Sequence, residues 1–169
     1  MSSAARKLDL LTFAPERLGD RAQVDDLIAR AFGPGRYVKA AERLREGREP
    51  DRDLSLVAWS GGAVVGCVRL WPVRIGQTPA LLLGPFAVDP EFRSQGLGAE
   101  LITRACDAAR AAGHALIILV GDAPYFAPLG FVPAPREVRL PGPVDTRRVL
   151  TLALREGAAE GLEGLVVAG

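Results

Sequence analysis

The sequence predicts an α/β fold, which some schemes class as α+β: a three-layer α/β/α sandwich around a mixed, mostly antiparallel sheet. Residues 54–88 have the pattern of an antiparallel meander, and residues 80–120 that of a strand, a crossover helix and a second strand. Further short strands follow. Because a strand, a crossover helix and a strand make parallel neighbours, we expect a central parallel strand pair with helices on both faces.

The N-terminal part predicts an edge strand and two helices. Residues 8–13 form a short apolar run, followed by Pro15, and Asp20 is a candidate N-cap. The first helix has one apolar stripe at helical spacing, formed by Val24, Leu27, Ile28 and Ala31, and it stops at Gly33. A second, more polar helix is expected over residues 38–46.

The meander begins with an alternating run over residues 54–59 and continues, after the Gly61-Gly62 turn, over residues 63–73. Residues 80–88 are almost all apolar, which predicts a central strand buried on both faces. Pro85 cannot donate a ladder hydrogen bond, so this strand must be bulged or unpaired there. Some of its backbone groups are therefore free for another partner.

The C-terminal half predicts a long amphipathic helix over residues 95–112, a buried strand over residues 115–120 and a short helix over residues 124–129. Runs at 138–140, 149–154 and 162–167 predict closing antiparallel strands. The last run either completes the sheet or leaves an exposed edge, on which a homodimer is possible.

Composition excludes several classes of protein. The 169 residues, at 17.9 kDa, fit a single domain over residues 1–169, and the net charge of +1 argues against a nucleic-acid binder. No apolar run is long enough to span a membrane, and charges among the first eleven residues argue against a signal peptide, so we expect a cytoplasmic protein. Cys67 and Cys106 have neither a paired spacing nor neighbouring histidines, which predicts buried thiols and no metal site.

The strongest motif is the segment 83–98, LGPFAVDPEFRSQGLG, in which a buried strand passes through a glycine loop into a helix start. Unpaired amides there bind phosphate, although two glycines also serve tight helix packing. The Walker pattern is missing, and a dinucleotide fingerprint would need glycine at Leu101. Arg93, Gly96 and Gly98 satisfy a third pattern, Arg/Gln-x-x-Gly-x-Gly/Ala.

In the motif of this loop, the chain resembles the GNAT superfamily of acyl-CoA-dependent N-acetyltransferases. The order of elements and the segment 125–131, YFAPLGF, after the next strand are also similar to that family. Gly121-Asp122 and the segment 129–133, LGFVP, resemble a bacterial branch of predicted small N-acetyltransferases.

The resemblance implies acetyl-CoA as the acyl-donor cosubstrate. Backbone groups of Phe86, Ala87 and Val88 would pair with the pantetheine arm like an added strand. The pyrophosphate would be held by the amides of Arg93, Ser94, Gln95, Gly96, Leu97, Gly98 and Ala99. The thioester would lie where the strand ending at Val88 splays from the strand ending at Val120, and the amine would enter from the opposite side.

Two residues are candidates for the chemistry. The family commonly protonates the thiolate with a tyrosine four residues before the glycine of its Gly-Phe pair, but Phe126 stands there, so the neighbouring Tyr125 is the candidate acid. No Asp or Glu occurs in residues 54–88. Asp122 is therefore the best-placed base, or else the N-cap of the next helix, and water is a further candidate base.

Other charged and aromatic residues carry weaker signals. Arginines and acidic residues alternate over residues 36–52, which is typical of a solvated helix face. In this family the first two helices often border the acceptor site, so these charges are also candidates for selecting an acidic acceptor. Trp59 and Trp71 are expected in the core, and His114 is expected to be structural.

The predicted function is acetyl transfer from acetyl-CoA to a primary amine by direct attack, without a covalent enzyme intermediate. The acceptor, a small molecule or a peptide, is left open. The alternatives are a non-catalytic acyl-CoA-binding or sensing module of the same fold and an NAD-dependent oxidoreductase.

Overall fold

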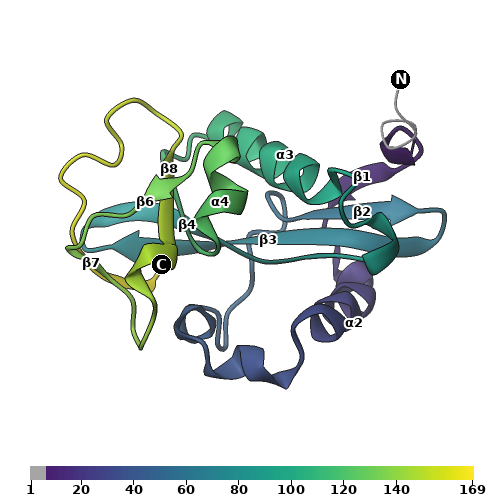
Figure 1. The fold of residues 1–169 in the computed structure, drawn as a ribbon, viewed down its shortest axis with the longest axis horizontal. Helices are drawn as coiled ribbons and strands as arrows, with labels where there is room; N and C mark the ends of the chain where they lie inside the picture. The colour runs from purple at the N-terminus through teal and green to yellow at the C-terminus, as the bar shows by residue number, and fades with distance from the viewer. Residues whose placement is uncertain (1–6) are drawn as a thin grey trace.

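The computed structural model describes residues 7–169 and contains a mixed nine-stranded sheet (Figure 1). Seven strands follow the order β1-β2-β3-β4-β5-β8-β6, and β9 pairs with the end of β3 and with β7. Their bounds are β1 (Thr12–Pro15), β2 (Leu56–Ser60), β3 (Ala63–Ile75), β4 (Thr78–Val88), β5 (Leu116–Val120), β6 (Val132–Pro133), β7 (Val138–Arg139), β8 (Val149–Ala153) and β9 (Gly164–Ala168).

The predicted parallel pair is confirmed, because β4 and β5 run parallel around Leu81 and Leu82. One expectation about the C-terminal strands is wrong: β7 pairs with β9 in parallel rather than antiparallel. The chain between these two strands includes β8, which pairs antiparallel with β5, so the connection from β7 to β9 crosses over and returns in the same direction.

Helices α2 (Arg21–Phe32) and α3 (Leu97–Ala111) cover opposite faces of the sheet (Figure 1), which confirms the three layers. Neighbouring residues of a strand point to opposite faces. Cys67 of β3 accordingly packs in the cluster that contains the apolar stripe of α2, while Val68 packs in the cluster that contains the apolar face of α3.

The bulge expected at Pro85 is present. Val68 pairs with Phe86 and Leu70 with Leu83, so Gly84 and Pro85 lie opposite a single residue of β3. The indole Nε1–H of the buried Trp71 donates to the Gly84 carbonyl at 2.6 Å. This bond gives a partner to a carbonyl that the interrupted ladder leaves free.

Beyond Leu82 the strands β4 and β5 separate. Their pairing is limited to Leu81 with Ile117 and Leu82 with Ile118, whereas β5 stays paired with β8 as far as Val120. The second half of β4 therefore has a neighbouring strand, β3, on one edge alone.

The predicted N-terminal edge strand is present as β1, but its predicted bounds are wrong, because it spans Thr12–Pro15 instead of residues 8–13. An edge strand tolerates Pro15 since its missing N–H faces no partner. Asp20 is the N-cap residue of α2, as predicted, but its side chain does not cap the helix, because its carboxylate accepts from the Arg17 amide at 2.8 Å instead.

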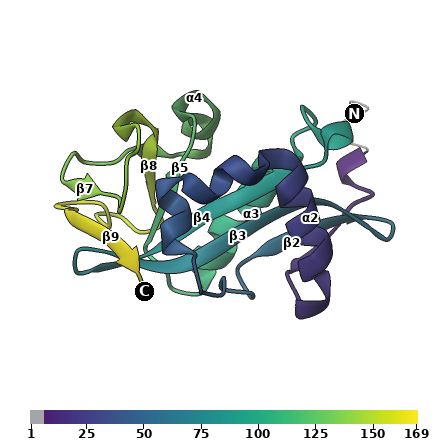
Figure 2. The same cartoon turned by 90° about the horizontal axis from the view of Figure 1, so that it is seen from below.

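The segment after α2 contains two 3₁₀ turns, η2 (Pro34–Val38) and η3 (Ala40–Leu44), instead of the predicted helix over residues 38–46. Lys39 between them is extended, with ψ at 144°, which interrupts helical hydrogen bonding. Figure 2 shows that this segment crosses the face of the sheet that α2 also covers. Ala40 and Leu44 pack there in the same cluster as Trp71.

The short helix near residue 124 is confirmed as α4 (Ala123–Phe126), which continues into the turn η5 (Ala127–Leu129) and ends at Gly130 with φ at +96°. Cys67 and Cys106 are free and buried, as predicted. In the part of the chain that the structure describes, no helix has the length and apolar character to cross a membrane.

Candidate active site

Two cavities lie along the open half of β4. The first has a volume of about 400 Å³ and is bounded by the end of β4, the loop after it and the start of α3. Of the ten predicted cofactor-binding residues, all except Gln95 line it. The amide group of the Gln95 side chain is turned back to donate to the Glu91 carbonyl at 2.6 Å.

The loop after β4 is held in the shape that brings the start of α3 to this cavity. Ser94 and Gly96 adopt left-handed backbone conformations, with φ at +60° and +87°. Arg93 Nε donates to the Val88 carbonyl at 3.2 Å, and the Asp89 carboxylate accepts from the Glu91 amide at 3.0 Å. The amides in the first turn of α3 have no intrahelical acceptor, so the cavity is bordered by free donors at the positive end of the helix dipole.

A side chain at Gly98 would not fit here. A Cβ on Gly98 would stand 2.5 Å from Tyr125 Oη and 3.5 Å from Cε2 of Phe86. Because Gly98 has no side chain, the hydroxyl of Tyr125 can lie where a Cβ would otherwise clash with it.

The rings of Tyr125 and Phe126 meet edge to face at 4.9 Å, but their exposure differs. Tyr125 is 44% exposed and stacks on Phe86, with ring centroids 5.9 Å apart and planes 21° apart. Phe126 is 4% exposed and meets Phe131 edge to face at 5.6 Å. Partial burial raises the pKa of the Tyr125 phenol above its ordinary value, so it stays protonated through neutral pH.

The second cavity, of about 530 Å³, lies on the other side of Phe86 and Tyr125, which line both cavities together with Phe32. Its walls come from the bulge of β4, the end of β5, the helix α4, the turns η2 and η3, and the loop of residues 143–148. The two cavities therefore adjoin at the position of a stacked aromatic pair.

Asp122 lines the second cavity, and its side chain is 78% exposed. The carboxylate lies 3.3 Å from Arg148 Nε and accepts no hydrogen bond from α4, so the side-chain N-cap interpretation is wrong. The backbone carbonyl of Asp122 does begin the helix, accepting from the amides of Tyr125 and Phe126.

Among the residues of the second cavity, Phe32 and Lys39 carried no site assignment from the sequence, whereas Arg36 and Arg45 were among the charges named as candidates for selecting an acidic acceptor. Phe32 continues the apolar stripe of α2 four residues after Ile28, which is a signal that the periodicity contains. The three cations lie in the segment predicted as a solvated helix. Ala40, Ala41 and Leu44 of this segment are buried. Their apolar side chains were the sequence signal that one side of the segment faces the protein interior.

Comparisons with known proteins agree on one family. A profile of the Acetyltransferase (GNAT) family matches residues 21–131. YhbS of Escherichia coli K12, an uncharacterized N-acetyltransferase, is 31% identical in an alignment of 153 residues that covers 87% of this chain and 89% of YhbS. YjhQ of the same strain, also an uncharacterized N-acetyltransferase, is 27% identical in an alignment of 136 residues that covers 78% of this chain and 75% of YjhQ.

Solved structures give the same result. The crystal structure of E. coli YhbS in complex with CoA superposes with a TM-score of 0.81 at 27% identity, covering 94% of this chain and 89% of that one. A GNAT family acetyltransferase of Brucella melitensis in complex with acetyl-CoA gives 0.71 at 26% identity, covering 94% and 96%. The profile spans more than half of the residues and includes both the loop after β4 and Tyr125, and on this evidence the chain belongs to the GNAT acetyltransferase family.

Proposed function

We propose that this protein transfers an acetyl group from acetyl-CoA to a primary amine by direct attack. The observation that carries the proposal is the open edge of β4, which lies along both cavities. Free helix amides border the first cavity, and Tyr125 lies where the first cavity adjoins the second.

The first cavity suits the CoA part of the donor. The pantetheine arm carries two amides, which pair with the free backbone groups of Phe86, Ala87 and Val88 as an added strand would. The pyrophosphate lies against the amides of residues 93–99, where Gly96, with no atom nearer than 3.8 Å to the position of a Cβ, lets an anion approach the backbone closely. The complexes of the YhbS and Brucella structures with CoA and acetyl-CoA support this assignment.

The reaction needs no cosubstrate beyond the donor and the amine. The neutral amine attacks the thioester carbon, and a backbone N–H of the open strand stabilises the resulting oxyanion. As the C–N bond forms, the C–S bond breaks, and the thiolate takes a proton from the Tyr125 hydroxyl. The excess proton of the new amide nitrogen passes to water or to Asp122, and Tyr125 is reprotonated from solvent, to which it is 44% exposed.

One feature favours a second candidate, a non-catalytic acyl-CoA-binding or sensing module. Phe126 occupies the position where the family commonly has its acid, and its ring is buried in the core. If Tyr125 does not reach the sulfur, the site binds the donor without turning it over efficiently.

The test combines binding and turnover. Calorimetry with acetyl-CoA, CoA and NAD measures which ligand binds, and a thiol-release assay over a panel of amines measures transfer. We expect binding of acetyl-CoA and CoA, no binding of NAD, and amine-dependent release of CoA. No binding of acetyl-CoA at high micromolar concentration contradicts both candidates. Binding without turnover on any amine supports the non-catalytic module, and binding of NAD alone supports an oxidoreductase.

A further inference from the structure

One wall of the second cavity carries three cationic side chains. Arg36, Lys39 and Arg45 all line it, and all come from the η2 and η3 segment. None of the three lines the first cavity, where the pyrophosphate is assigned, so their charges are not accounted for by CoA.

Arg45 is a buried cation with incomplete compensation. Its side chain is 14% exposed, and its one ion pair among the described residues joins Nη1 to Glu42 Oε2 at 3.2 Å. Arg45 Nε is buried with no hydrogen-bond partner within residues 7–169. Burial of an unsatisfied charged donor is costly, so the Arg45 guanidinium keeps hydrogen-bonding capacity that residues 7–169 do not fill.

Arg36 and Lys39 add positive charge that no carboxylate neutralises among residues 7–169. Arg36 donates to the Tyr37 hydroxyl at 2.7 Å, and the Lys39 ammonium lies 5.4 Å from the centroid of the Phe32 ring. Both partners are neutral. The wall therefore carries three cations, and Glu42, the carboxylate partner of Arg45, does not itself line the cavity.

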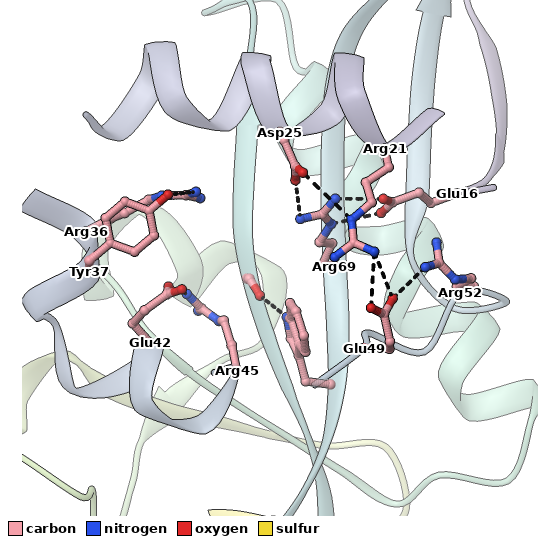
Figure 3. Close-up of polar contacts among 12 residues, drawn as sticks. Glu16, Arg21, Asp25, Arg36, Tyr37, Glu42, Arg45, Glu49, Arg52 and Arg69 are labelled. Carbon is pink, nitrogen blue, oxygen red and sulfur yellow. Dashed lines mark hydrogen bonds and ion pairs between the residues drawn. The ribbon is translucent and has the colours of Figure 1, made fainter. Parts of the chain in front are cut away.

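Several other charged groups near this cavity are already paired. On the facing wall, Asp122 pairs with Arg148, and Asp145 pairs with Arg147. Behind the cationic wall, Arg69 is held by Glu16 and Asp25, at 2.7 Å and 2.8 Å. Figure 3 shows the network of Arg69, Glu16 and Asp25 beneath α2, and it shows Arg36, Glu42 and Arg45 as a separate group. None of these ion pairs includes Arg36, Lys39 or Arg45, so they leave the charge of the cavity wall uncompensated.

We propose that the acceptor is a small amine that also carries an anionic oxygen group, a carboxylate or a phosphate, held by Arg36, Lys39 and Arg45; this rests on the proposed function. A guanidinium binds either group with two parallel hydrogen bonds. A Cβ on Gly84 would stand 3.2 Å from Arg45 Nη2, so the guanidinium lies beside β4 two residues before Phe86. Two residues of a strand span about 7 Å, so an anion held by Arg45 lies a few bonds from an amine that reacts beside Phe86.

The test uses equilibrium binding to the CoA-saturated protein, so it needs no turnover. The probes are matched pairs of acetylated products. N-acetylglycine and N-acetyl-β-alanine are compared with their carboxamides, and N-acetyl-aminoethyl phosphate is compared with N-acetylethanolamine. We expect the anionic member of at least one pair to bind about tenfold more tightly, because charge-assisted hydrogen bonds are stronger than neutral ones. The pair that shows the preference distinguishes a carboxylate from a phosphate.

Two variants assign the preference to this wall. Arg36→Gln with Lys39→Gln removes the two unpaired cations, and Arg45→Gln with Glu42→Gln removes the ion pair without leaving either charge alone. Both should lose most of the preference. Arg43→Gln is the matched control, since Arg43 is an exposed arginine of η3 that lines neither cavity.

Equal binding within every pair, or a preference that both double variants retain, overturns the inference. Thiol release measured in parallel separates it from the proposed function. Acetylation of neutral amines with no anion preference contradicts the inference alone. Anion preference without turnover on any amine supports it and contradicts acetyl transfer.

Discussion

The hydroxyl of Tyr125 lies against the backbone of Gly98, so that a Cβ on Gly98 would stand only 2.5 Å from the hydroxyl oxygen. This contact joins α4 to the first turn of α3. It fixes a phenol at the boundary between two cavities, on a ring that stacks on Phe86 of the open strand. A side chain one helical position later, at Phe126, lies instead in the core.

Tyr125→Phe removes the candidate acid and keeps the stacked ring. We expect kcat to fall about a hundredfold, the usual contribution of a positioned proton donor, with the Kd for acetyl-CoA unchanged. Because burial raises the pKa of Tyr125, the wild-type hydroxyl should remain protonated at pH 9, and activity there should rise as the amine loses its proton. Steady-state rates and calorimetry measure these quantities. An unchanged kcat would remove Tyr125 from the chemistry.

Gly98→Ala places a methyl group where the Tyr125 hydroxyl lies. Helix propensity favours alanine over glycine by about 1 kcal/mol, so the free energy of unfolding should not fall much. The displaced tyrosine and the narrowed first cavity should weaken acetyl-CoA binding about tenfold, or ~1.4 kcal/mol. Gly62→Ala is the control, since nothing lies within 4 Å of a Cβ there. Wild-type affinity in Gly98→Ala would contradict the arrangement.

Trp71→Phe removes the donor to the Gly84 carbonyl and keeps most of the buried ring. A buried acceptor without its partner costs about 1–3 kcal/mol, which urea denaturation measures. The KM for acetyl-CoA should also rise, because Gly84 lies at the start of the open edge of β4. Trp59→Phe, on a half-buried indole, should change both values less. Equal effects of the two substitutions would show that the bond to Gly84 has no special role.

Glu16→Gln leaves the buried Arg69 with one of its two carboxylate partners, Asp25. Burial disfavours the charged form of Arg69, but Glu16 and Asp25 outweigh it and raise the pKa of the guanidinium. We expect a loss of about 3 kcal/mol in the free energy of unfolding. Asp26→Asn, on a carboxylate that is 67% exposed, should cost less than about 1 kcal/mol. Because this network lies outside both cavities, acetyl-CoA affinity should stay near the wild-type value.

Cys67 and Cys106 should not react with thiol reagents in the folded protein. Burial raises the pKa of each thiol to about 12, so about one in ten thousand would be thiolate at pH 8. Titration with a chromogenic disulfide should detect the two thiols per chain after unfolding and none before it. Rapid reaction of the native protein would contradict this burial and would add a background to the thiol-release assay.

Much of the fold could be predicted because its signals are local. The alternating runs of β2 and β3, the apolar stripes of α2 and α3 and the glycine loop before α3 each lie within a short stretch of sequence. Pro85 predicted the bulge of β4, since a missing N–H has the same consequence in any sheet. The residues predicted to bind the cofactor come from the resemblance of this stretch to the family, and all except Gln95 line the first cavity.

By itself, the sequence determined the order of elements, the helix start that suits a pyrophosphate and the family. Tertiary structure alone decided that Tyr125, and not Phe126, lines both cavities, whether Asp122 caps a helix or pairs with Arg148, and which cations of the η2 and η3 segment line the second cavity. The physical reason is that these outcomes depend on contacts between residues far apart in the chain. A local pattern fixes the type of an element, whereas the packing of α4 on β4, and of η3 on Trp71, fixes the direction of each side chain.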